Sequence, residues 1–201
     1  MSVTRFPLAI FAATLASGTV YADSNIQDVQ QRNVYQEQRI LDGLKSGSLS
    51  TREAAQLERE QQKILLMQVD ALKRKGMKEG EKARVSAEQD RVSKLIAEAN
   101  QNDAKGNPNS ATSRAMQDAV AQNLNQQRRI QQGLADGTLT NAEVLKLQQG
   151  QARVVALEAK LAKGGLTEEE QARIDKTGST QSDRIYDQRH DEQDRGENVP
   201  K

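Results

Sequence analysis

The sequence predicts an all-α protein, and three of its features lead to that prediction. Strong helix formers (Gln, Ala, Glu, Lys, Arg and Leu) dominate the 201 residues, whereas aromatic residues make up only 2%. Apolar residues recur at helical spacing, as Ile64, Leu65 and Leu72 do. The chain also repeats itself, and each copy contains short, glycine-bearing turns between successive helices, which we call corners. Together these features predict two tandem three-helix units of antiparallel amphipathic helices.

The first 22 residues have the features of a secretory signal peptide. One basic residue, Arg5, precedes an apolar run over residues 6–16, and small residues lead to Ala22. We therefore expect a periplasmic or secreted protein from which residues 1–22 are removed. The chain has no cysteine, so neither a lipid anchor nor disulfide bridges are expected.

The charge balance and the low aromatic content argue against several classes of partner. The chain holds 29 basic and 28 acidic residues. One of the basic residues lies in the predicted signal peptide (the leader, residues 1–22), so the rest of the chain has equal numbers of basic and acidic residues. A surface without an excess of basic residues is not expected to bind nucleic acid. No segment after the leader is apolar enough for membrane insertion. Outside the leader the only aromatic residues are Tyr35 and Tyr186. Because organic cofactors usually sit in apolar and aromatic pockets, no cofactor is expected.

The internal repeat sets the expected domain organisation. Residues 39–61 match residues 129–151 at an offset of 90, and residues 76–85 match residues 165–174 at an offset of 89. A stretch rich in Asn, Gly and Pro separates the copies and is typical of a linker. We expect a signal peptide (1–22), a first repeat (23–101), a linker (102–112), a second repeat (113–195) and a disordered tail (196–201). The expected helices span roughly 24–45, 51–75, 79–101, 113–135, 141–163 and 168–194.

A corner of common spacing joins successive helices within each copy. A left-handed glycine is expected to end the incoming helix, and a Ser or Thr followed three residues later by Glu is expected to cap the next one as a capping box. These positions are Gly47, Gly137 and Gly164 for the glycines, and Ser50 with Glu53, Thr140 with Glu143, and Thr167 with Glu170 for the boxes. The second corner departs from the pattern, because Lys78 stands at the cap position and Gly80 in the first turn. We expect that helix start to be the weakest.

The same corners resemble EF-hand calcium loops in their spacing. In the first corner, Asp42, Ser46 and Glu53 would be the calcium ligands. However, the third ligand position is apolar in all four corners, as at Leu44 and Leu134, and a leucine cannot coordinate a hard cation. We therefore favour EF-hand-like corners that cap and pack, without calcium ligands.

A second candidate metal site lies near the C-terminus. Asp187, His190 and Asp191 lie at helical spacing and are residue types that bind zinc or copper. This is the only histidine, and arginines are interspersed with the acids, which favours a solvated helix with ion pairs. No arrangement of nucleophile, base and stabilising group is recognisable, so no catalytic residues and no enzyme activity are expected.

The second repeat resembles a group of short, secreted, mostly uncharacterised proteobacterial proteins with repeated Gly-x-Leu-Thr-x-x-Glu helical corners. The matching segments are Arg129-Ile130, residues 137–143, residues 167–173, residues 182–186 and Arg189-His190-Asp191. A weaker likeness is to the Spy-type periplasmic chaperones, which carry Leu-Thr-x-x-Gln elements where this chain reads LTNAE and LTEEE. The resemblance implies export and a helical fold, and it implies no activity.

These observations lead to a functional expectation. We expect a non-enzymatic periplasmic helical protein that acts through protein–protein contact, in envelope stress or as a chaperone. Its contact surface would be the apolar stripe along one face of each helix, which we call the seam. Asn33, Glu37, Gln61 and Gln68 lie on or near those seams, which is also compatible with coiled-coil self-association. The alternative is a periplasmic metal-binding or metal-stress protein that takes calcium, zinc or copper.

Overall fold

The computed structural model describes residues 17–74, 76–161 and 167–191, and confirms the all-α prediction over these ranges. The six helices are α1 (Ser17–Ser46), α2 (Thr51–Arg74), α3 (Glu79–Gln101), α4 (Ala111–Asp136), α5 (Asn141–Leu161) and α6 (Glu168–Arg189). The leader up to residue 16 and the tail at 196–201 lie outside the described residues. None of the described helices is both long and apolar enough to cross a bilayer.

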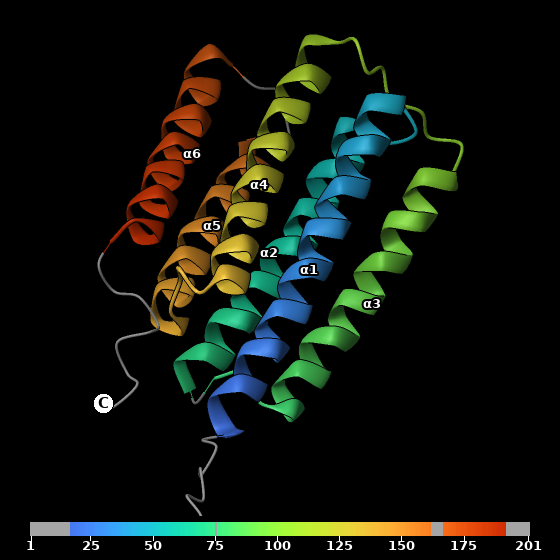
Figure 1. The fold of residues 1–201 in the computed structure, drawn as a ribbon. Helices are drawn as coiled ribbons and strands as arrows, with labels where there is room; N and C mark the ends of the chain where they lie inside the picture. The colour runs from blue at the N-terminus through green and yellow to red at the C-terminus, as the bar shows by residue number, and fades with distance from the viewer. Residues whose placement is uncertain (1–16, 75, 162–166, 192–201) are drawn as a thin grey trace, which may run out of the picture.

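The central helices pair across the two repeats. The most extensive helix contacts join α2 to α5 and α1 to α4, while α3 packs on α1 and α2, and α6 packs on α4 and α5. Figure 1 shows α3 and α6 at opposite edges of the bundle. Gln27 in the first half of α1 donates to the carbonyl of Leu134 near the end of α4, at 3.2 Å. Arg59 near the start of α2 likewise donates to the carbonyl of Ala159 near the end of α5, at 3.2 Å. Both central pairs are therefore antiparallel.

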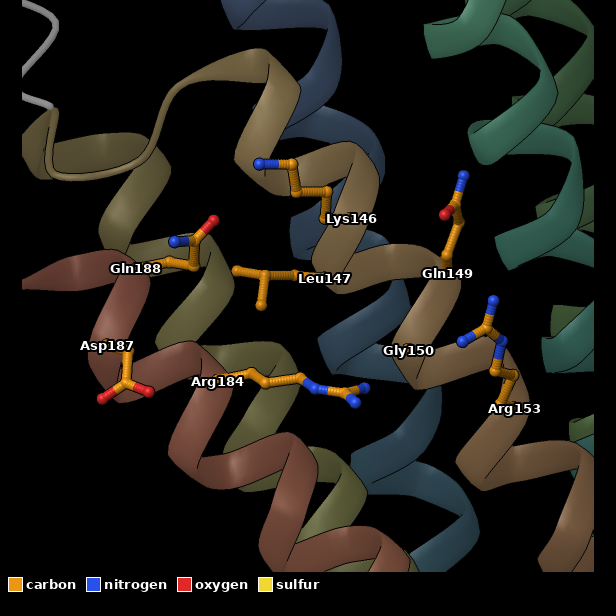
Figure 2. A pocket seen from close by; sticks show the side chains of 8 residues that line it. All are labelled: Lys146, Leu147, Gln149, Gly150, Arg153, Arg184, Asp187 and Gln188. Carbon is orange, nitrogen blue, oxygen red and sulfur yellow. The ribbon is translucent and has the colours of Figure 1, made fainter. Parts of the chain in front are cut away.

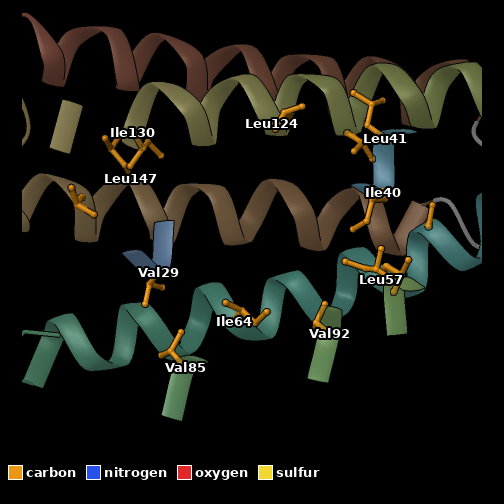
Figure 3. Close-up of a cluster of buried hydrophobic side chains, with 14 of the residues drawn as sticks. Val29, Ile40, Leu41, Leu57, Ile64, Val85, Val92, Leu124, Ile130 and Leu147 are labelled. Carbon is orange, nitrogen blue, oxygen red and sulfur yellow. The ribbon is translucent and has the colours of Figure 1, made fainter. Parts of the chain in front are cut away.

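One hydrophobic cluster extends through both repeats. It includes Val29 of α1, Ile64 of α2, Leu124 of α4 and Leu147 of α5, all buried (Figure 3). Full burial of such a side chain contributes about 1.5–3 kcal/mol to folding. The apolar seams that the sequence predicts are thus buried against each other inside this chain.

The corners have the predicted capping chemistry. Side-chain and backbone hydrogen bonds of 2.7–3.3 Å form capping boxes between Ser50 and Glu53, Thr140 and Glu143, and Thr167 and Glu170. Gly47 and Gly137 have φ angles of 75° and 83°, which places both in the left-handed region as predicted. Gly164 lies outside the described residues.

Two further details of the corners agree with the sequence pattern. Leu44 and Leu134, which stand where an EF-hand would have its third ligand, are at most 1% exposed, so they are packing residues. Lys78 has the extended backbone of a cap, with φ −70° and ψ 164°, but its side chain makes no capping hydrogen bond. The linker packs onto the first corner, because the Gly106 N–H donates to the Gly47 carbonyl at 2.9 Å.

The end of the last helix differs from the expectation. The sequence predicts a helix to residue 194, but α6 ends at Arg189 with His190 as its C-cap. The His190 N–H bonds to the carbonyl of Asp187 at 3.1 Å, a tighter turn that closes the helix.

Candidate functional site: a buried carboxyl cluster

Three carboxyl groups lie in the interior between the two repeats. Glu37 on α1, Glu58 on α2 and Glu158 on α5 are each at most 1% exposed. Helical spacing places them on the buried faces of their helices, with Ile40 one turn after Glu37 and Gln61 one turn after Glu58. Burying an ionised carboxylate without a compensating partner is strongly unfavourable, so the protonation of these groups is the main question at this site.

The three carboxyl groups interact with one another. The carboxyl groups of Glu37 and Glu58 adjoin, and none of their four oxygens has a donor among the other described residues, so a hydrogen bond between the two groups requires a proton on one of them. Glu158 lies close enough to repel both of them electrostatically. Asn123 on α4 donates to Glu158 Oε2 at 2.5 Å and accepts from Gln151 Nε2 at 2.9 Å. The cluster thus draws on four helices from both repeats.

The environment of the cluster favours the protonated form. Burial, reinforced by the charge of Glu158, raises the pKa of Glu37 to about 8, although its hydrogen bond with Glu58 acts in the opposite direction. Burial and the neighbouring Glu37 raise the pKa of Glu58 well above its usual range. Burial and the charge of Glu58 do the same to the pKa of Glu158, against the hydrogen bond from Asn123. The folded protein therefore holds protons in this cluster at neutral pH.

The duplication places glutamines where the other repeat has these glutamates. At the offset of 90, Glu37 corresponds to Gln127, Glu58 to Gln148, and Glu158 to Gln68. All three glutamines are at most 2% exposed. Glutamine is the uncharged isostere of a protonated glutamic acid, so each position accommodates an uncharged group of that shape. At these three pairs of positions, therefore, only the glutamate member can gain charge.

Other polar groups in the interior attach the outer helices. Gln36 on α1 donates to the Gln89 carbonyl at 2.6 Å and to Ser93 Oγ at 2.8 Å, both on α3. Its counterpart Gln126 on α4 makes the equivalent bonds to α6, to the carbonyl of Gly178 at 2.7 Å and to Ser182 Oγ at 2.8 Å. These bonds are satisfied in both repeats, in contrast to the amide nitrogen and oxygen of Gln148, which find no partner among the described residues.

Two surface grooves occupy equivalent positions in the repeats and differ in charge. The groove between α5 and α6, of about 410 Å³, is shown in Figure 2, and its charged lining residues are Lys146, Arg153, Arg184 and Asp187. The groove between α2 and α3, of about 560 Å³, has the charged lining residues Glu53, Arg59, Glu60 and Glu98. The lysine and both arginines of the first groove are exposed to solvent. Both grooves are open, solvated surfaces rather than enclosed pockets.

The candidate zinc or copper ligands lie at the end of α6. The ring of His190 stacks on that of Tyr186 with 4.1 Å between centroids, and its Nδ1 is 2.8 Å from the Tyr186 carbonyl oxygen. Asp187 lines the α5–α6 groove, and Asp191 accepts from Gln188 at 3.1 Å. Across the ranges that the structure describes, no three His, Cys, Asp or Glu side chains are arranged to hold a metal ion.

The candidate calcium ligands of the first corner each form local hydrogen bonds. Asp42 accepts from Gln38 at 2.7 Å, and the Ser46 hydroxyl donates to the Gly43 carbonyl at 3.2 Å. Glu53 is the acid of the capping box and also accepts from Asn102 at 2.7 Å. Partial burial opposes ionisation of Glu53, but the hydrogen bonds from Asn102 and Ser50 outweigh it and lower its pKa. Its carboxylate therefore caps the start of α2 and binds Asn102 at the end of α3.

Comparisons with known proteins add no assignment. No family model matches the chain, and no curated protein or solved structure is found to be similar to it. A proposal about function must therefore rest on the geometry of the cluster and of the helices around it.

The sequence alone indicates only part of this cluster. It places Glu37 near the apolar seam, whereas nothing in it singles out Glu58 and Glu158 as buried acids. The available signal is helical phase, since Glu58 lies three residues before Gln61, and Glu158 seven residues after Gln151, each in phase with a buried position.

Proposed function

We propose that this protein is an exported, non-enzymatic helical protein that acts through protein–protein contact, in a chaperone-like manner, by binding apolar segments of other chains along the seams of its own helices. The observation that carries the proposal is the composition of the interface between the repeats. That interface combines amphipathic seams with many buried polar atoms, several of which have no hydrogen-bond partner among the described residues.

The unsatisfied polar atoms weaken the closed bundle. Both amide atoms of Gln148, Nε2 of Gln68 and Oε1 of Gln127 are buried without a partner in the described part of the chain. Each such group costs about 1–3 kcal/mol relative to a hydrated one. Because the sequence has no cysteine, no disulfide holds α2 against α5 or α1 against α4, and side-chain packing is joined by only a few hydrogen bonds such as those of Gln27 and Arg59. Separation of the repeats is therefore less unfavourable than for a fully apolar interface of the same size.

Opening would create the contact surface. In the closed form the exposed large hydrophobic side chains of the described residues are Tyr35, Leu66 and Tyr186, which are scattered over different helices. When α2 and α5 separate, the apolar side chains packed between them become accessible, and these include Leu65 of α2 with Ala152 and Val155 of α5. Such a surface matches the helix-in-groove and seam contacts by which helical proteins bind apolar partners.

The test is suppression of client aggregation. The chain without its predicted leader is mixed at stoichiometric ratios with several unfolding client proteins, and aggregation is followed by light scattering. The matched variant is Gln68→Met with Gln148→Met, which replaces unpaired amides by apolar groups of similar shape and stabilises the closed form. We expect protection by the wild type and weaker protection by the variant. If added hydrophobicity alone governed binding, the variant would protect better, and absence of protection for every client would refute the proposal.

A further inference from the structure

We propose that Glu37, Glu58 and Glu158 form a proton-controlled latch between the two repeats, which holds the bundle closed while protonated and releases α2 from α5 when its protons are lost at higher pH. This inference rests on the proposed function, because it names what regulates exposure of the seams.

The three carboxyl groups are placed so that their ionisation would push the two repeats apart. Glu37 and Glu58 belong to the first repeat, and Glu158 belongs to the second. While protons are present, the Glu37–Glu58 hydrogen bond and the Asn123–Glu158 bond accommodate all three side chains without net charge. Ionisation places like charges on α1, α2 and α5 in a medium of low dielectric constant, where repulsion is strong. The repulsion between Glu58 and Glu158 acts across the α2–α5 interface, the most extensive one in the bundle.

Arginines on the helices that carry the cluster bind to other groups. On α1, α2 and α4 these arginines donate to outer or neighbouring groups: Arg39 to the Ser93 carbonyl, Arg59 to the Ala159 carbonyl, and Arg128 to Gln38 Oε1. The outer helices α3 and α6 direct the uncharged side chains of Gln89 and Gln181 into the interior, which bind the carbonyls of Val29 and Leu147. On α5, the buried positions one and two turns before Glu158 hold the apolar Val155 and the uncharged Gln151. No basic side chain that the structure describes forms an ion pair with Glu37, Glu58 or Glu158, so protons are left to neutralise this cluster.

The sign of the effect follows from linkage. A carboxyl whose pKa is higher in the folded than in the unfolded protein binds more protons when folded, so its contribution to stability is complete below the unfolded value of 4.5. That contribution decreases as pH rises from 4.5 towards about 8, the value for Glu37. The glutamines at the equivalent end of the interior do not titrate, so the loosening starts at the glutamate end.

Urea unfolding of the full chain between pH 5 and pH 9 tests the latch. The key variant combines E37Q, E58Q and E158Q, which introduces the residues that the other repeat carries at these positions. The control combines E79Q, E98Q and E169Q, three exposed glutamates, and makes the same change in formal charge. We expect the unfolding equilibrium constant of the wild type and the control to rise about tenfold per pH unit for each proton released, and that of the key variant to stay nearly constant. A key variant that retains the wild-type pH dependence would overturn the latch.

A second measurement uses the wild type alone, so it stands if the variant does not fold. Unfolding at pH 6.5 should release protons into a weakly buffered solution, and carbon-13 NMR should show three glutamate carboxyl groups that titrate well above the ordinary value of 4.5 in the folded protein. Unfolding without proton release contradicts the proposal.

Client protection separates the latch from the proposed function. Wild-type protection that grows from pH 5 to pH 8, and does not change with pH in the key variant, supports both. Loss of pH-dependent stability in the variant without client protection at any pH supports the latch and refutes the function. Protection together with pH-independent wild-type stability refutes the latch alone.

Discussion

The start of α3 permits a direct test of the corner chemistry, because it has capping backbone geometry without a capping side chain. Lys78 has φ −70° and ψ 164°, close to the φ −75° and ψ 162° of Thr167, whose capping box is complete. Glu81 stands three residues after Lys78, as Glu170 does after Thr167. The substitution Lys78→Ser therefore supplies the one missing group, a hydroxyl at the cap position.

The expected gain can be worked out from its parts. A Ser cap typically contributes about 1 kcal/mol, and removing a positive charge from a helix N-terminus adds about 0.3–1 kcal/mol. Completing the box requires Glu81 to leave its 3.4 Å ion pair with Arg84, an exposed pair whose loss costs about 0.2–1 kcal/mol. The net gain for Lys78→Ser is therefore about 1 kcal/mol, which corresponds to about 2–4 °C in Tm for a chain of this size.

Thermal and urea unfolding followed by circular dichroism measure this gain. The control is Lys78→Ala, which removes the same charge without supplying a hydroxyl. We expect Lys78→Ser to be more stable than Lys78→Ala by about 0.5 kcal/mol, because the cap is partly offset by loss of the Glu81–Arg84 pair. Equal stability of the two variants would mean that the hydroxyl does not cap this helix, and the reasoning about the corners would be wrong.

Three further predictions concern glycine, the carboxyl cluster and metals. In thermal unfolding, Gly80→Ala should stabilise by about 0.5–1 kcal/mol because its new Cβ meets no atom, whereas Gly137→Ala should destabilise by about 1–2 kcal/mol because its φ is 83°. In urea unfolding, Asn123→Ala should destabilise by about 1–3 kcal/mol, and by more at pH 8 than at pH 5, because the hydrogen bond from Asn123 favours the ionised form of Glu158, whose share grows with pH. In calorimetric titrations with calcium, zinc and copper, we expect no binding at the end of α6, and binding that His190→Ala abolishes would instead support a metal-binding function.

The helices and corners were predictable because their determinants are local. Capping boxes, left-handed glycines and apolar spacing act within a few residues, and the predicted bounds agree with α2 to α5 within two residues. The pairing of α1 with α4 and of α2 with α5 was not predictable in the same way, because it depends on contacts between residues about 100 positions apart. Amphipathic seams alone are compatible with several partners, including another copy of the chain.

The carboxyl cluster was only partly predictable for a related reason. Glutamate is rarely buried, so an isolated sequence favours an exposed position for Glu58 and Glu158. Glu58 lies beside Glu37 of α1, and Glu158 lies beside Glu58 of α2 and Asn123 of α4, so their burial depends on helices distant in the sequence. Their helical phase was visible in the sequence, but the helices that cover them were not.

The clustering itself follows from antiparallel pairing. Glu58 precedes Gln68 on α2 by ten residues, and Gln148 precedes Glu158 on α5 by the same interval. The two helices thus carry the same spacing with the acid and amide exchanged. Because α2 and α5 run in opposite directions, this exchange brings both acids to one end, where Glu37 joins them, and both amides to the other.

Glutamates at the surface affect stability in the acidic pH range, whereas the buried carboxyl cluster affects it at higher pH. Partial burial of Glu60 is outweighed by hydrogen bonds from Lys63 and Arg91, which lower its pKa, and the hydrogen bond from Arg91 lowers the pKa of Glu88. Groups with a lowered pKa stabilise the folded protein above their unfolded value, and this contribution is lost as pH falls through the lowered one. The buried cluster loses its contribution as pH rises above 4.5. The two sets of glutamates therefore limit stability from opposite sides, and maximum stability is expected at mildly acidic pH, with the α2–α5 interface loosening first on the alkaline side.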